Sequence, residues 1–185
     1  MFGATQQEKQ NRLASLQALQ PQWLLIDGAS CPEPLAYAKG ISMEHDSVFN
    51  VSDQHLADNG PWLIAVNNNV DLMRHCLTAD PQGYGCLWFD STLTKSALIG
   101  QWQQRIYAEL PDGTETRFRS YDPRVCHFYL NGSTLERQAE FLAPFERFFY
   151  ADLNPYFVAL RWPCWQAKTP EQYQQQFLDI AEVNT

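Results

Sequence analysis

Three short apolar runs in the first half of the chain alternate with segments whose apolar residues have helical spacing. The runs cover 22–27, 62–66 and 85–89, and glycine or polar residues bound them. Runs of this kind are typical of strands buried on both faces of a sheet. Helices are predicted to begin at Asn69, after the second run, and at 90–92, after the third. The pattern predicts an α/β (α+β) fold with a mixed sheet and flanking helices.

Capping signals define the N-terminal region. Thr5 and Glu8 form a capping box that opens a helix ending before Pro21. Residues 33–39 are predicted as a short helix. Residues 44–59 contain few apolar positions and are predicted as irregular, with one short strand.

A β-hairpin is predicted near residues 105–121. Its two strands are joined by a turn that contains Asp112 and Gly113, directly after a proline. Proline presets φ at the start of a turn, and glycine accepts the positive φ that the turn requires. This is the clearest hairpin in the sequence.

Two helices are predicted after the hairpin. Asp122 occupies the N-cap position and Pro123 the first helical position of a helix over 124–130. A second capping box at 133–136 opens a helix that ends near residue 143.

The C-terminal part is predicted to be short and helical. Apolar runs at 145–150 and 157–162 are predicted strands, and a last helix opens at 169–172 with Tyr173 and Phe177 on one stripe. No internal repeat or linker stands out.

Composition narrows the function classes. The formal net charge is -8 and the pI is about 4.9, which disfavours nucleic acid and anionic lipid as partners, because both need a positive protein surface. The five cysteines are odd in number and widely separated, which favours a reducing compartment. No apolar stretch approaches the ~20 residues of a membrane span, so we expect a soluble cytoplasmic protein.

Local motifs for catalysis are absent from the sequence: it contains no G-x-S-x-G, H-E-x-x-H, P-loop or G-x-G-x-x-G pattern. We therefore expect neither enzymatic activity nor a cofactor or bound metal. The alternative is a small hydrolase or metal enzyme, built on Cys126 or on a folded-back loop that brings together Glu44, His45, Asp46 and His55.

The segment 117–125 contains more charged residues than the packing of a hydrophobic core requires. Arg117, Arg119 and Tyr121 share one face of the second hairpin strand, and Arg124 follows the helix cap. Arginine is enriched at interface hot spots, so these four residues are candidate partner contacts. In the alternative interpretation, Asp122 pairs with an arginine and the segment only holds the hairpin against the next helix.

Aromatic residues crowd the region from 141 to 165. Consecutive aromatic pairs direct one ring to each face of a strand, so some rings need a cover beyond a single core. Four members are candidate partner-binding residues: Phe148, Tyr150, Trp162 and Trp165. The alternative is that the tract is simply core.

The order of these residues resembles the type VI secretion effector adaptors, also called Tap or TEC chaperones and first catalogued as a domain of unknown function. The resemblance spans about residues 23–150 and is most specific at the Tyr-Asp-Pro-Arg stretch that follows the hairpin. The residues that carry it are Leu25, Asp27, Ala29, Pro61, Leu63, Gly85, Ser91, Leu110, Pro111, Asp112, Gly113, Arg119, Tyr121, Asp122, Pro123, Arg124, Val125, Phe141 and Pro144.

This resemblance implies a non-enzymatic adaptor in the bacterial cytoplasm that binds a toxic effector protein and delivers it to the VgrG spike. We expect an adaptor-type α/β domain over 1–150 with its N-terminal helix, and a short extension over 151–185, one strand and one helix, packed on that domain. No nucleic acid, membrane or small-molecule substrate is expected. A further alternative is an immunity protein that binds and neutralises a toxin.

Overall fold

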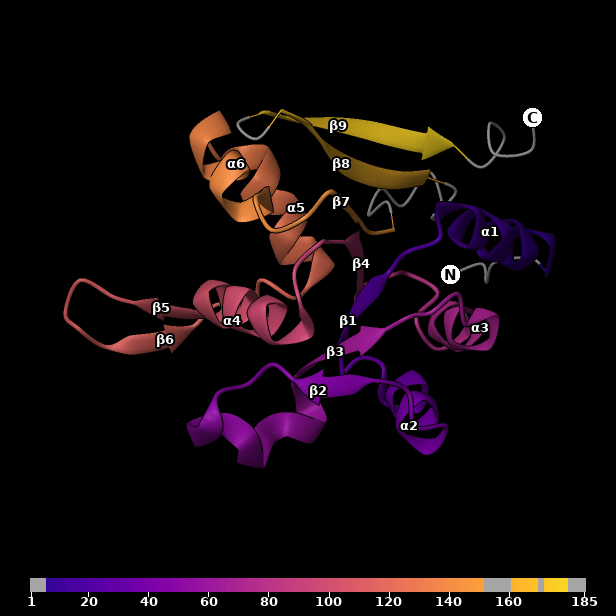
Figure 1. The fold of residues 1–185 in the computed structure, drawn as a ribbon, viewed down its shortest axis with the longest axis horizontal. Helices are drawn as coiled ribbons and strands as arrows, with labels where there is room; N and C mark the ends of the chain where they lie inside the picture. The colour runs from indigo at the N-terminus through magenta and orange to yellow at the C-terminus, as the bar shows by residue number, and fades with distance from the viewer. Residues whose placement is uncertain (1–5, 152–160, 170–171, 180–185) are drawn as a thin grey trace.

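One antiparallel sheet organises the chain (Figure 1). A computed structural model describes residues 6–151, 161–169 and 172–179. In this part of the chain the seven-stranded sheet has the order β2-β3-β1-β4-β7-β8-β9. Its strands are β1 (Trp23–Asp27), β2 (His45–Ser47), β3 (Pro61–Ala65), β4 (Cys86–Asp90), β7 (Arg147–Phe149), β8 (Arg161–Thr169) and β9 (Gln172–Asp179). The predicted α+β class with flanking helices is confirmed.

Neighbouring strands of this sheet pair antiparallel, so the predicted mixed sheet is corrected in this respect. The reason is that β1 lies between β3 and β4 and runs opposite to both. β3 and β4 therefore point the same way and are joined by a helix. The strand and helix alternation in the sequence does correspond to a β-α-β unit, but one split by an inserted strand.

Helices cover both faces of the sheet. Their bounds are α1 (Gln6–Leu19), α2 (Pro32–Gly40), α3 (Val70–Ala79), α4 (Lys95–Ile106), α5 (Pro123–Gly132) and α6 (Leu135–Leu142). One buried cluster joins α1, α2 and α3 to one face, and a second joins α4, α5 and α6 to the other. Leu24 and Ile26 of β1 lie in the first cluster and Leu25 in the second. All three are fully buried, as predicted for a central strand.

Local capping rules hold at most helix starts. Asn69 accepts a hydrogen bond from the Leu72 amide at 2.9 Å and caps α3. The predicted cap at 90–92 is wrong, because α4 is capped by Thr94. Asp90 is instead a buried β4 residue whose carboxylate accepts a hydrogen bond from Arg147. The irregular segment contains β2 and a 3-10 helix, η1 (Val51–Asn59).

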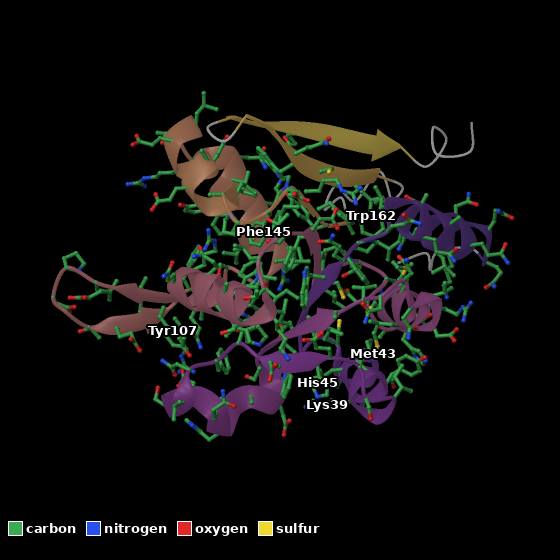
Figure 2. All side chains as sticks on the ribbon, in the orientation of Figure 1. Lys39, Met43, His45, Tyr107, Phe145 and Trp162 are labelled. Atoms are coloured by element: carbon green, nitrogen blue, oxygen red, sulfur yellow. The ribbon has the colours of Figure 1, made fainter. Side chains whose placement is uncertain are left out.

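The hairpin extends from the body of the protein beside α4 (Figure 1). β5 (Tyr107–Glu109) and β6 (Glu115–Arg117) are antiparallel, as predicted, although shorter. Gly113 has φ of 81°, and Asp112 accepts a hydrogen bond from the Thr114 amide, so both turn residues have the expected roles. At the base, the Tyr107 hydroxyl donates to Asp53 of η1 at 2.7 Å (Figure 2).

The C-terminal part differs from its prediction. Residues 172–179 form strand β9 instead of a helix, and β9 pairs with β8, which in turn pairs with β7. The free energy that this segment gains by pairing with the edge of the sheet outweighs its local preference for a helix. Of the predicted strand at 157–162, residues 157–160 lie outside the described residues, as does the predicted cap at Thr5. None of the described helices is long and apolar enough to cross a membrane.

Candidate functional site

Asp27 closes β1 and connects it to the end of the hairpin. Its side chain is almost fully buried, and its carboxylate accepts hydrogen bonds from the Ala29 amide at 3.1 Å and the Ser30 hydroxyl at 2.9 Å. Arg119 donates a third bond at 2.9 Å. A buried carboxylate is stable as an anion only when donors replace its water, and these three do so. The arrangement fixes the end of β6 against the β1 turn.

The turn after Asp27 also requires a close backbone approach. The Gly28 amide donates to the Gly60 carbonyl at 2.8 Å. A Cβ atom on Gly28 would lie 2.4 Å from the Asp58 carbonyl oxygen, which no side chain can tolerate without a backbone shift. Glycine therefore allows β1 and the start of β3 to meet at this end of the sheet.

Asp122 begins α5 as predicted. Its carboxylate accepts from the Arg124 amide at 2.9 Å and forms two bonds with the Arg124 guanidinium, at 2.9 and 2.6 Å. Pro123 occupies the first turn. Burial opposes ionisation of Asp122, but the hydrogen bonds from Arg124 outweigh it and lower the pKa of the carboxyl group. The Arg124 guanidinium also lies 4.6 Å from the centroid of the Tyr84 ring.

The predicted arginines form a half-exposed surface, which we define as Arg117, Arg119 and Arg124. Each guanidinium pairs with a carboxylate, and Arg117 reaches Asp53 at 3.6 Å. Tyr121 differs from the prediction for partner contacts, because it is buried beneath Arg119, whose guanidinium lies 5.5 Å from the ring centroid. Burial raises the pKa of Tyr121. The arginine surface therefore combines a structural role with accessible cationic groups.

The aromatic candidates are core residues. Phe148, Tyr150, Trp162 and Trp165 are each at most 4% exposed, so the prediction that they form a partner surface is wrong for this structure. Phe148, Tyr150 and Trp165 pack under α4, α5 and α6, while Trp162 packs in the cluster on the opposite face. Figure 2 shows Trp162 inside the body of the protein. The two helix layers supply the cover that consecutive aromatics need.

Sequence reasoning missed a groove at the base of the hairpin, which we call the aromatic groove. It has a volume of about 290 Å³ and is lined by Gln101, Gln104, Arg105, Phe118, Tyr129, Glu140 and Phe141. The Phe118 and Tyr129 rings are 6.1 Å apart, and Tyr129 and Phe141 are 5.4 Å apart. The alternation of Phe118 with the neighbouring arginines was the available signal, because it directs this ring to the other face of the strand.

Large apolar side chains are also exposed on the two helices that border the groove. Phe128 of α5 is 76% exposed and Leu135 at the start of α6 is 78% exposed. Phe128 directly follows His127, whose ring it contacts edge-on. Exposed aromatic and aliphatic residues are characteristic of protein-binding surfaces.

The loop proposed for a metal enzyme does not converge on a common point. Lys95 pairs with Glu44 at 3.2 Å and with Asp46 at 2.6 Å. His45 contacts the Met43 carbonyl oxygen at 2.6 Å (Figure 2). His55 contacts a carbonyl within its own 3-10 helix instead. These side chains therefore serve local structure.

Cys126 is fully buried in the core and donates to the Ser120 carbonyl at 2.9 Å. Burial raises the pKa of its thiol, which disfavours the thiolate that a nucleophile needs.

Among the residues that the structure describes, one set of His, Cys, Asp and Glu side chains has ligand atoms close enough to share an ion: Cys31, Asp80 and Cys86.

Comparison with known proteins identifies a family but no characterised relative. No curated protein and no solved structure matches the chain. A family described as a domain of unknown function, DUF4123, matches residues 22–140, from the start of β1 to the end region of α6. This range includes the Asp27 turn, the hairpin, the arginine surface and the whole aromatic groove except Phe141. Because the match covers more than half of the chain, the protein belongs to the DUF4123 family.

Proposed function

We propose that this protein is a non-enzymatic adaptor that binds a type VI secretion effector and helps to load it onto the VgrG spike. The observation that carries the proposal is the aromatic groove, together with the exposed Phe128 and Leu135 on the adjoining helices. Further support is the resemblance of the chain to effector adaptors, which includes Asp27 and Arg119, the two residues that join the end of the hairpin to β1.

The groove suits a protein segment as its occupant. Its walls are aromatic rings and its rim carries amide and charged groups, which is the usual anatomy of an interface with an apolar centre and a polar edge. Its volume accommodates a few side chains, so an effector segment would insert anchor residues while its backbone lies across α5 and α6. Phe128 would enlarge the contact outside the groove.

Arg105 fixes the back of the groove. Its guanidinium donates to the Phe141 carbonyl at 2.8 and 3.1 Å and to the Glu140 carbonyl at 3.1 Å, and so it joins α4 to the end of α6. A groove whose walls are already held in position loses little conformational entropy on binding. This favours capture of a segment without rearrangement of the adaptor.

The arginine surface provides a second contact of different chemistry. Arg117, Arg119 and Arg124 are each about half exposed, so their guanidiniums can bind further acceptors beyond their own carboxylates. An adaptor needs contacts with two partners. We assign the aromatic groove to the effector and the arginine surface to the spike.

The test is co-purification from the native cell lysate, with identification of the bound proteins by mass spectrometry. The wild-type chain is expected to recover a VgrG protein together with a toxin-like protein. Phe118→Ser combined with Phe128→Ser should lose the toxin and keep the spike, with an unchanged thermal melting curve. Ile41→Ser is the matched control, because Ile41 is 47% exposed at the end of α2, away from the groove.

Other outcomes would replace the proposal. If the chain recovers a toxin without a spike and blocks the toxin's activity, the protein is an immunity protein. If it recovers neither and the purified sample hydrolyses model substrates, the enzyme alternative replaces the adaptor. Equal losses in the groove variant and in Ile41→Ser would remove the groove from the binding surface.

A further inference from the structure

Three metal-ligating side chains from distant parts of the sequence meet at the start of β4. Cys31 lies just before α2, Asp80 just after α3, and Cys86 is the first residue of β4. Their ligand atoms all lie within 4.8 Å of one another. Both thiols are buried, and the carboxylate is partly buried. No sequence motif signals this set, because Asp80 lies 49 positions after Cys31.

The spacing of the two sulfur atoms suits a tetrahedral ion. Cys31 Sγ and Cys86 Sγ are 3.9 Å apart. With zinc-to-sulfur bonds of about 2.3 Å, a tetrahedral centre places two thiolates about 3.8 Å apart. The pair therefore needs almost no movement to bind one zinc ion between them.

The surrounding backbone holds the carboxylate in place and keeps the centre open. The Gly85 amide donates to Asp80 Oδ2 at 2.7 Å, which orients the carboxylate as outer contacts orient ligands in metal sites. A Cβ atom on Gly85 would lie 2.7 Å from Cys31 Sγ and 3.6 Å from Asp80 Oδ2. Glycine at this position thus preserves the space among the ligands.

A small cavity borders the same group. Its volume is about 10 Å³, about enough for a single water molecule, and its lining includes Arg12, Cys76, Asp80 and Cys86. Cys76 is buried and interacts with the Cys86 thiol, but its sulfur is not among the ligand atoms that all lie within 4.8 Å of one another. A water molecule in this cavity can serve as the fourth ligand to the ion.

We propose that Cys31, Asp80 and Cys86 form a zinc site that joins α2, α3 and β4. Two thiolates and one carboxylate carry three negative charges, of which a zinc ion balances two, and the buried Arg12 lines the adjoining cavity. Thiolate ligands favour zinc over magnesium or calcium, which prefer oxygen ligands alone. The site borders the Asp27 turn, since the Cys31 amide donates to the Asp27 carbonyl at 2.8 Å. This role is independent of the proposed adaptor function.

The test is metal binding by the full-length chain, purified under reducing conditions without a polyhistidine tag. After dialysis against zinc-free buffer, elemental analysis should find one zinc ion per chain. Cobalt substitution should give the visible spectrum of a tetrahedral ion and a thiolate-to-cobalt charge-transfer band in the near ultraviolet. Cys31→Ser and Cys86→Ser should weaken zinc binding by more than about 100-fold, and Asp80→Asn by about 10-fold to 100-fold.

The matched control is Cys126→Ser, which changes a buried cysteine in the other cluster and leaves a hydroxyl that can still donate to Ser120. This variant should keep the zinc and the cobalt spectrum. If a serine variant fails to fold, the zinc affinity of Asp80→Asn and the cobalt spectrum of the wild-type chain still show whether the site binds the ion. The proposal is overturned if the reduced wild-type chain takes up no zinc or cobalt, or if Cys126→Ser loses the metal as readily as the ligand variants.

Discussion

Arg119 donates a 2.9 Å hydrogen bond to the carboxylate of Asp27, a residue 92 positions earlier in the chain. The two side chains have opposite environments, since Asp27 is 1% exposed and Arg119 is 51% exposed. The bond ties the end of the hairpin to the central strand of the sheet. Arg119 belongs to the arginine surface and its neighbour Phe118 lines the aromatic groove, so the bond helps to position both.

Removal of Asp27 should destabilise the fold more than removal of Arg119. We expect Asp27→Ala to lower the free energy of unfolding by about 2–4 kcal/mol, because it also removes the acceptor for Ala29 and Ser30. Arg119→Ala should lower it by only about 1–2 kcal/mol, because water reaches the exposed side of the pair. Urea denaturation of each variant measures both changes.

Arg117→Ala is the control for this pair. The Arg117 side chain is 48% exposed and its guanidinium lies 3.6 Å from Asp53, so its loss should change the free energy of unfolding by no more than about 0.5 kcal/mol. Similar losses for Arg117→Ala and Arg119→Ala would mean that the bond to Asp27 has no special role.

Gly28→Ala should be among the most damaging small substitutions. The new Cβ would meet the Asp58 carbonyl oxygen at 2.4 Å, and this oxygen belongs to the backbone and cannot rotate away. We expect a loss of about 1–3 kcal/mol in the free energy of unfolding, measured by thermal or urea denaturation. Gly100→Ala is the control, since a Cβ there meets nothing within 4 Å inside α4. It should stabilise the protein by up to about 1 kcal/mol, and destabilisation of similar size in both variants would contradict the steric explanation.

Asp122 should make the protein sensitive to acid. Its pKa is lowered from the ordinary value of 3.8, so its ionised form stabilises the fold above about pH 4. That contribution is lost as the pH falls through the folded-state pKa. Asp122→Asn keeps a capping oxygen but loses the ionic bonds to Arg124, so wild type should exceed the variant in stability near neutral pH, and the difference should vanish in strong acid.

The measurement is the free energy of unfolding of both proteins as a function of pH. Asp58→Asn is the control, since Asp58 is 92% exposed and pairs with Lys39 at 3.4 Å. A difference between wild type and Asp122→Asn that stays constant from neutral to acid pH would show that ionisation of Asp122 does not contribute. Asp122→Ala removes the cap as well and should cost about 1 kcal/mol or more near neutral pH.

The elements predicted best are those specified by nearby residues. β1, β3 and β4 follow from short apolar runs, and the start of α5 follows from Asp122 and Pro123. These features depend on local chemistry that one segment contains in full. β9 depends on pairing with β8, so the helical spacing of its apolar residues was misleading.

The candidate sites were harder to predict for the same reason. Two contacts form only when the sheet brings distant segments together: Asp27 with Arg119, and Cys31 with Cys86. No neighbouring residues in the sequence predict either contact. The aromatic tract at 141–165 was misjudged for a different reason. Its pattern correctly indicates side chains on both faces of a strand, but composition does not tell whether helices or a partner cover them.

Trp165 and Phe128 provide a direct test of which aromatic residues are core and which are surface. Trp165 is 4% exposed and pairs through β8 with Phe148, whereas Phe128 is 76% exposed on α5. We expect Trp165→Ala to lower the free energy of unfolding by about 3–5 kcal/mol through the cavity that it leaves. Phe128→Ala should change it by no more than about 0.5 kcal/mol. Urea denaturation measures both. A small loss for Trp165→Ala would return the C-terminal aromatics to the list of surface candidates, because a residue that packs in the core cannot be removed without a cavity.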